Sequence, residues 1–149
     1  MENNRRGYFG IGVYGAKTEI NIGTLWRSAH NFGASFIFTI GARYKKQCSD
    51  TTKAWKHIPL FNYKTFTEFN NLRPCDSPLI AIEQTNKSKS IREFKHPERA
   101  IYLLGAEDYG IPSKILEKCQ DVIHISTPMC LNVAVAGSIV MFDRGNKNS

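Results

Sequence analysis

The sequence has no apolar run long enough to cross a membrane. A membrane-spanning helix needs about 18 consecutive apolar residues, whereas the 42% of hydrophobic residues here are spread over all 149 positions. The opening segment, MENNRRGYFG, carries two arginines but no apolar core of the length that an export signal has. We therefore expect a cytoplasmic protein that is neither exported nor embedded in a membrane.

Cysteine is scarce, and its spacing matches no metal site. The chain has four cysteines: Cys48, Cys75, Cys119 and Cys130. None of them form the closely spaced pairs of a zinc-binding motif, and the number is small for a disulfide-stapled scaffold. We expect reduced thiols and no bound metal.

Acidic residues are fewer than basic ones. The sequence has 13 Asp and Glu against 20 Lys and Arg, a formal net charge of +7. Such an excess favours polyanionic partners, because basic side chains neutralise phosphates and release counterions. Charge alone does not distinguish RNA from DNA. Repeats and domain linkers are also absent, so we expect a single domain over residues 1–149, with a disordered tail at 145–149.

Short apolar runs alternate with amphipathic segments, which is typical of a mostly parallel α/β sheet flanked by helices. Strands are predicted at residues 8–14, 34–40, 58–60, 79–82, 100–104 and 122–125, and helices at 19–33, 65–72, 111–119 and 131–144. Open α/β sheets bind ligands beyond the carboxyl ends of their strands. The irregular loops 105–110 and 126–130 follow strands in this way, so we expect a ligand site between them.

The first predicted strand contains Gly10-x-Gly12-x-x-Gly15, which formally matches a dinucleotide-binding fingerprint. That fingerprint requires a strand before the glycines and a helix that begins at them. Too little apolar chain precedes Gly10, and the helical pattern begins only near Ile22. We therefore interpret the glycines as allowing close packing or a bend in a strand.

The first predicted helix separates an apolar stripe from a polar one. Asn21 is placed to cap its start and Gly33 to close its end. The residues at core-facing spacing are Ile22, Leu25, Ala29 and Phe32. Arg27 lies on a different stripe, with only Gly23 one turn before it, which leaves room for a ligand. The alternative is a capping Asn and a solvated Arg.

A basic segment follows the second predicted strand. Its cations are Arg43, Lys45, Lys46, Lys53 and Lys56, interleaved with Tyr44 and Trp55. This mixture suits single-stranded RNA, whose phosphates attract charge and whose unstacked bases need flat surfaces. A merely solvated basic loop is the alternative.

Three stretches together resemble the motifs of the SpoU-type (TrmH-like) 2′-O-ribose RNA methyltransferases of the SPOUT superfamily. The stretch that begins at Asn21, NIGTLWR, is similar to that family's Asn-x-Gly-x3-Arg motif. GAEDYGIP, beginning at Gly105, is similar to its Gly-x-Glu-x2-Gly motif. PMCLNVAVA, beginning at Pro128, is similar to its last motif. Relatives often have a spacer before Ser-Leu-Asn-Val; here the spacer is missing and Cys130 stands in the serine position.

The resemblance implies a fold with a deep C-terminal trefoil knot, which no pattern of residues would suggest because knots are so rare. It also implies S-adenosylmethionine as cofactor and a homodimer formed through the first and last helices. The family-like cofactor positions are Ile82, Gly105, Ile125, Cys130 and Leu131.

The same resemblance implies the catalytic residues Arg27, Asn21, Glu107 and Asn132. The family's arginine is thought to ease loss of the hydroxyl proton. A guanidinium is normally always protonated, so we expect Arg27 to engage the RNA phosphate and stabilise negative charge on the 2′ oxygen; a role as base remains open if the phosphate perturbs it. Glu107 is expected to orient Arg27 or Asn21, or else to lie at a helix N-terminus. Asn132 either positions the substrate or caps the last helix.

These expectations converge on an S-adenosylmethionine-dependent RNA 2′-O-ribose methyltransferase, with tRNA favoured over rRNA because many compact members of the family act on tRNA. One alternative is a non-catalytic RNA-binding module of the same fold. Another is a nucleotide-dependent enzyme that uses the glycines at positions 10–15. A nucleophilic Cys130 activated by the nearby His124 is a further, disfavoured possibility, because buried cysteines are common in cores.

Overall fold

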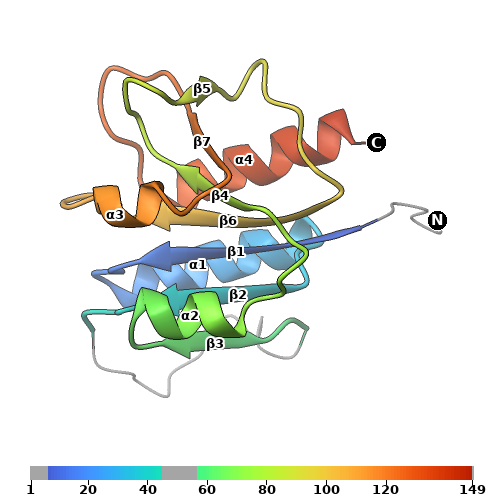
Figure 1. Cartoon of the computed structure of the whole chain (residues 1–149). Helices are drawn as coiled ribbons and strands as arrows, with labels where there is room; N and C mark the ends of the chain where they lie inside the picture. The colour runs from blue at the N-terminus through green and yellow to red at the C-terminus, as the bar shows by residue number, and fades with distance from the viewer. Residues whose placement is uncertain (1–6, 45–56, 149) are drawn as a thin grey trace.

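Seven strands form one sheet, and every pairing within it is parallel. The structure is a computed structural model that describes residues 7–44 and 57–148 (Figure 1). The strands are β1 (Tyr8–Tyr14), β2 (Phe36–Ile40), β3 (Leu60–Tyr63), β4 (Leu79–Ile82), β5 (Lys89–Ser90), β6 (Arg99–Gly105) and β7 (Asp121–His124). Their order across the sheet is β3-β2-β1-β6-β4-β7-β5. The predicted mostly parallel α/β fold is confirmed.

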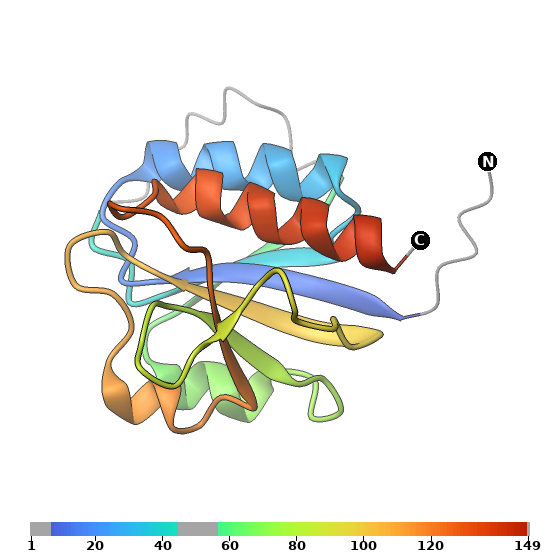
Figure 2. The ribbon, with the colours of Figure 1, turned by 90° about the horizontal axis from the view of Figure 1, so that it is seen from above.

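Helices cover both faces of this sheet. They are α1 (Glu19–Asn31), α2 (Phe66–Leu72), α3 (Ser113–Leu116) and α4 (Val133–Lys147). Figure 2 shows α1 and α4 side by side on one face and α2 and α3 on the other. None of the helices in residues 7–44 and 57–148 is both long and apolar enough to cross a bilayer.

Strand β6 lies at the centre of the sheet and supplies both layers of the core. Ala100, Tyr102 and Leu104 join the apolar cluster beneath α1 and α4, while Ile101 and Leu103 join the cluster beneath α2 and α3. This alternation follows from the period of two residues along a strand. Because both faces are covered, the strand is apolar almost throughout, as expected for a buried parallel sheet.

The glycines of β1 make room for aromatic rings on β2. A Cβ atom added at Gly10 would lie 2.3 Å from the Phe36 ring, and one added at Gly12 would lie 2.4 Å from the Phe38 ring. No side chain fits into these gaps, so the glycines serve close packing. The packing interpretation of the glycine motif is confirmed at these two positions.

Helix α1 begins at Glu19, as the predicted range 19–33 has it, but its N-cap is not the predicted Asn21. The chain is extended at Thr18, which is the N-cap, and is helical from Glu19 onward. Asn21 therefore lies inside the first turn, and its predicted capping role is wrong. Gly33 adopts a φ of 83° just after the helix, as expected of a closing glycine. Of the predicted core positions Ile22, Leu25 and Ala29 are buried, and Phe32 is partly buried against them.

Helix α4 extends to Lys147, so the prediction of a disordered tail is wrong for residues 145–147. The Lys147 ammonium donates hydrogen bonds to the Ile91 and Phe94 carbonyls and pairs with Asp143 one turn earlier. These contacts hold the last turn of α4 against residues 91–98. The amino-acid composition of the tail does not predict them.

A buried polar network ties the same helix to the centre of the sheet. His96 lies 2.7 Å from an Asp143 oxygen through Nε2 and 2.6 Å from the Tyr102 hydroxyl through Nδ1. Arg144 donates to the Pro97 carbonyl and to the Tyr102 hydroxyl. These partners fit a neutral imidazole that donates to Asp143 and accepts from Tyr102. Burial lowers the pKa of His96 despite Asp143, and burial raises the pKa of Tyr102 to about 12.

The packing of β1 predicts opposite outcomes for two glycine substitutions. Gly12→Ala places a methyl group against Phe38 in a packed core and should lower the free energy of unfolding by about 1–3 kcal/mol. Gly23→Ala is the control: nothing lies within 4 Å of its added Cβ, so the better helix propensity should raise stability by up to about 1 kcal/mol. Urea denaturation of both variants measures this, and an unchanged Gly12→Ala midpoint would contradict the packing argument.

The His96 network predicts an acid-sensitive stability. Because the folded-state pKa lies below the unfolded value of about 6.5, the unfolded chain binds more protons as pH falls below that value. The free energy of unfolding should therefore decrease as pH falls below about 6.5, by at most about 1.4 kcal/mol per pH unit from this residue. Denaturation of the wild type and of His96→Gln between pH 7.5 and 5 measures the difference; parallel pH profiles would be the contrary result.

Candidate active site

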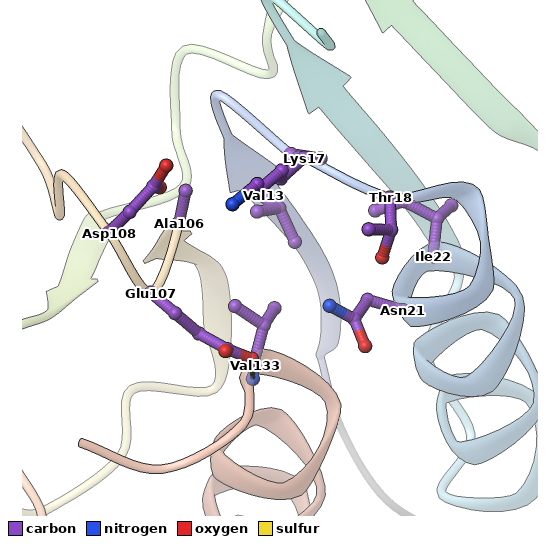
Figure 3. Close-up of a pocket in the computed structure, with 10 residues that line it drawn as sticks. Val13, Lys17, Thr18, Asn21, Ile22, Ala106, Glu107, Asp108 and Val133 are labelled. Atoms are coloured by element: carbon purple, nitrogen blue, oxygen red, sulfur yellow. Dashed lines mark hydrogen bonds between the residues drawn. The ribbon is translucent and has the colours of Figure 1, made fainter. Parts of the chain in front are cut away.

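Four loops meet at the carboxyl edge of the sheet, because parallel strands all end on the same side. Two cavities lie among them. The smaller, of about 480 Å³, is lined by Val13, Ala16, Lys17, Thr18, Asn21, Ile22, Ala106, Glu107, Asp108 and Val133 (Figure 3). The larger, of about 550 Å³, lies on the other side of the loop that follows β6 and shares Ala106, Glu107 and Val133 with the smaller one.

The larger cavity collects every residue predicted for the cofactor. Ile82, Gly105, Ile125, Cys130 and Leu131 all line it, although they come from four separate segments of the chain. Its volume lies within the usual range of small-molecule sites, about 300–1,000 Å³. Apolar and polar side chains line it together, as is usual for a small-molecule site.

Sequence reasoning missed Glu83, which directly follows β4 and holds the wall of the larger cavity. Its Oε2 accepts a hydrogen bond from the Ile111 amide at 3.0 Å. Gly110 has a φ of 66°, and a Cβ there would lie 2.6 Å from that oxygen. The glycine is therefore required both by its backbone angle and by the carboxylate. The only signal in the sequence was an acidic residue placed at the end of a buried strand.

Glu107 connects the loop after β6 to the start of α4. The loop closes on itself through a hydrogen bond of 2.8 Å from the Gly110 amide to the Ala106 carbonyl. Glu107 extends into the smaller cavity opposite Asn21 (Figure 3), and its Oε1 accepts from the Val133 amide at 3.3 Å. A carboxylate is favoured at this position by the dipole of α4. In the described residues Glu107 makes no hydrogen bond to Arg27 or Asn21.

Asn132 both caps α4 and contacts α1. Its Oδ1 accepts from the Ala134 and Val135 amides at 2.9 and 3.3 Å. Its Nδ2 donates to Asn21 Oδ1 at 3.0 Å, which joins the first turn of α1 to the start of α4. The two roles considered for Asn132 are thus compatible, because the oxygen caps the helix while the amide nitrogen holds Asn21.

Arg27 lies outside both cavities of its own chain. It is six residues beyond Asn21, or about 9 Å further along the helix at 1.5 Å per residue, and its side chain is exposed. Within residues 7–44 and 57–148 the guanidinium has no hydrogen-bond or ion-pair partner. Exposed apolar side chains occur on the same two packed helices, namely Ile20 of α1 and Val135, Ile139 and Phe142 of α4.

Arg43 is occupied within the chain. Its guanidinium holds Asp108 through two hydrogen bonds, of 2.7 and 3.0 Å, and its Nε donates to the Gly15 carbonyl at 2.9 Å. This pairing raises the pKa of Arg43 and lowers the pKa of Asp108. The other predicted RNA-binding residues, Lys45, Lys46 and Lys53, lie outside the described residues.

The cysteines within residues 7–44 and 57–148 show no catalytic arrangement, and Cys48 lies outside the described residues. Cys130 is exposed at the larger cavity, while His124 pairs through Nδ1 with the Ser88 hydroxyl at 2.8 Å. Cys75 and Cys119 are also free thiols, and burial raises the pKa of Cys119 to about 11. Within the described ranges no three His, Cys, Asp or Glu side chains are grouped as metal ligands would be.

Two characterised proteins are similar to this chain in sequence. The mouse tRNA (guanosine(18)-2′-O)-methyltransferase TARBP1 is 25% identical over 134 residues, which cover 83% of this chain and 8% of the mouse protein. The tRNA (guanosine(18)-2′-O)-methyltransferase of Saccharomyces cerevisiae is 30% identical over 67 residues, which cover 42% of this chain and 5% of the yeast protein. The chain thus spans less than a tenth of the length of either relative.

Solved structures share the fold over nearly the whole chain. An AdoMet-bound rRNA methyltransferase from Sinorhizobium meliloti superposes with a TM-score of 0.81 and 21% identity, covering 95% of this chain and 57% of that one. The sequence model of the SpoU rRNA Methylase family matches residues 9–142, and so includes all three of the motifs described above. The chain belongs to the SpoU rRNA Methylase family.

Proposed function

We propose that this protein transfers the methyl group of S-adenosylmethionine to a ribose 2′-hydroxyl of RNA, with tRNA favoured over rRNA. The observation that carries the proposal is the pair of adjoining cavities. One contains every residue expected to hold the cofactor, and the other contains Asn21, with Glu107 on the boundary that both share. The names of the mouse and yeast relatives, both tRNA 2′-O-methyltransferases, favour tRNA.

The larger cavity is the proposed cofactor site. S-adenosylmethionine supplies an electrophilic methyl group, so the protein has to position that group and exclude competing water. Ile82, Ile125 and Leu131 supply apolar walls, while Gly105 keeps the loop narrow, since a Cβ there would lie 2.5 Å from the Gly110 backbone.

The smaller cavity is the proposed site of the acceptor ribose. Asn21 and Asn132 are held together by their side-chain hydrogen bond, which presents amide groups to the sugar. Glu107 is anchored on the Val133 amide and faces the same space. Positioning of a hydroxyl in line with the methyl group can by itself contribute about 7–11 kcal/mol of barrier lowering.

Arg27 is proposed to act across a homodimer. Its own chain offers it no hydrogen-bond or ion-pair partner in the described residues, and α1 packs beside α4, whose side chains Val135, Ile139 and Phe142 are exposed. An interface between the α1–α4 faces of two chains would bury those side chains and bring Arg27 toward the partner's cavities. There its permanent positive charge would bind the RNA phosphate and stabilise charge on the 2′ oxygen.

A trefoil knot is also proposed, because the chain belongs to the SpoU rRNA Methylase family. β5 pairs with β7 at the edge of the sheet, and the Ile91 amide donates to the His124 carbonyl, so the loop of residues 83–98 lies against the end of β7. The chain then continues to α4, whose Arg144 and Lys147 are bonded to the same segment from the other side. The proposal is that residues 125–132 pass through this loop.

The remaining parts of the proposal concern location and RNA contacts. We propose a cytoplasmic protein, which fits the free thiols of the described residues. Lys45, Lys46 and Lys53 stay predicted RNA-binding residues on the strength of their charge.

Arg27 provides the main test of this function. Arg27→Ala should lower the rate of methyl transfer to bulk tRNA by about 100-fold or more, as loss of one stabilising charge commonly does, while calorimetry shows unchanged binding of S-adenosylmethionine. Arg92→Ala, an exposed arginine remote from both cavities, is the matched control. A wild-type protein that binds RNA but transfers no methyl group would instead favour the non-catalytic RNA-binding module.

Mixing two inactive variants tests the dimer. If Arg27 acts in the partner's site, a mixture of Arg27→Ala and Asn132→Ala should regain about a quarter of wild-type activity, since half the dimers are mixed and one site in each is intact. Activity that stays absent, although subunit exchange is demonstrated, would place Arg27 in its own chain's site.

Two substitutions at Asn132 separate its capping of α4 from its proposed role in substrate positioning. Asn132→Asp keeps the capping oxygen but loses the amide that donates to Asn21, so we expect near-native stability with reduced methyl transfer. Asn132→Ala loses both and should cost about 1 kcal/mol of stability as well. Thermal denaturation and methyl-transfer rates on the same samples measure this; full activity of Asn132→Asp would contradict a positioning role.

A further inference from the structure

Arg43 braces the two loops that form the outer side of the smaller cavity. Its Nε binds the Gly15 carbonyl in the loop after β1, and both terminal nitrogens bind Asp108 in the loop after β6. Its backbone amide also donates to the Ala16 carbonyl at 2.8 Å. Three of the five N–H groups of the guanidinium are thus used within the chain, and they tie one loop to the other.

Lys17 brings a positive charge to the smaller cavity. It is exposed, and among the described residues that line this cavity it is the only cation. The carboxylates there have other hydrogen-bond partners, Arg43 for Asp108 and the Val133 amide for Glu107, although the charge of Lys17 also contributes to lowering the pKa of Asp108. In the described part of the chain Lys17 has no hydrogen bond or ion pair. A phosphate is the natural partner for such a free ammonium next to a ribose site.

Tyr109 presents a flat ring beside the same brace. Its residue is 81% exposed, and the Arg43 guanidinium lies 4.9 Å from its ring centre. Tyr109 also lines the larger cavity, so it stands where that cavity opens. An exposed aromatic ring that contacts an arginine, in the loop between Gly105 and Gly110, can stack on a nucleobase.

We propose that Lys17 and Tyr109 hold the acceptor nucleotide at two points, with Arg43 as the positioning residue that sets the distance between them. Lys17 binds a phosphate that flanks the acceptor ribose, and Tyr109 stacks on a base. A base that stacks on a protein ring has left its own helix, so the substrate class is RNA with an unpaired nucleotide at the methylated position. This inference rests on the proposed function and specifies its substrate.

The two contacts differ in their dependence on salt, which gives the experiment. Binding of fluorescently labelled bulk tRNA is measured by anisotropy between 50 and 300 mM KCl, in the presence of S-adenosylmethionine. Lys17→Ala should weaken binding and make the slope of log affinity against log salt shallower by about 0.7, the value for one phosphate contact of a single strand. Tyr109→Ala should weaken binding about tenfold with an unchanged slope, and Tyr109→Phe should retain the affinity.

Competition with two unlabelled RNAs tests the substrate class. A single-stranded oligonucleotide should displace tRNA from the wild type more effectively than the same sequence in a duplex, and Tyr109→Ala should lose this preference. Arg43→Ala should show both defects together, because it releases both loops. The controls are Lys95→Ala, another exposed lysine, and Leu72→Ala, another exposed apolar residue; both lie away from the cavities.

The outcomes separate this inference from the proposed function. An unchanged salt slope in Lys17→Ala, equal affinities of Tyr109→Ala and Tyr109→Phe, or equal competition by duplex and single strand would overturn the two-point contact, even if the wild type methylates tRNA. If the binding changes appear but no methyl group is transferred, the contact stands and the proposed reaction fails. Circular dichroism of each variant shows that the fold is retained.

Discussion

The uniformly parallel pairing of the sheet is the constraint on which the rest of the structure depends. It places the ends of β1, β4, β6 and β7 at one edge, and thus brings four loops together that are far apart in the sequence. Two cavities form there with a common boundary at Glu107. A reaction between two ligands needs this arrangement, because each must have its own site while the reacting atoms meet.

The helices on one face of the sheet serve the core and the site at once. α1 and α4 pack closely where Gly137 faces Leu25, since a Cβ at that glycine would lie 2.6 Å from the leucine. The first turn of α1 carries Asn21 to the smaller cavity, the N-cap Asn132 of α4 bonds to it, and the far end of α4 is held by the network around His96. Arg27 is exposed on α1, and the proposed homodimer would use it in the partner's site.

Much of this was readable from the sequence, and the exceptions have physical reasons. The apolar runs predicted the strands, because buried parallel strands are hydrophobic throughout, and the motifs predicted which residues gather at the larger cavity. The cap of α1 was misassigned because Asn21 matches a capping residue by type, whereas Thr18 is the N-cap and the Asn21 side chain bonds to Asn132, 111 residues away. The roles of Glu83 and Arg43 depend on partners in other segments, so no local pattern reveals them.

Asn21 and Asn132 are 111 residues apart in the sequence, and this separation affects how the protein folds during synthesis. The contact between them closes a loop of most of the chain, and closure over such a separation is slow compared with formation of local structure. During synthesis the sheet strands up to β7 emerge before α4 does. The cavities therefore acquire their final shape only after α4 has left the ribosome, so a nascent chain that ends before α4 can hold neither ligand in its completed site.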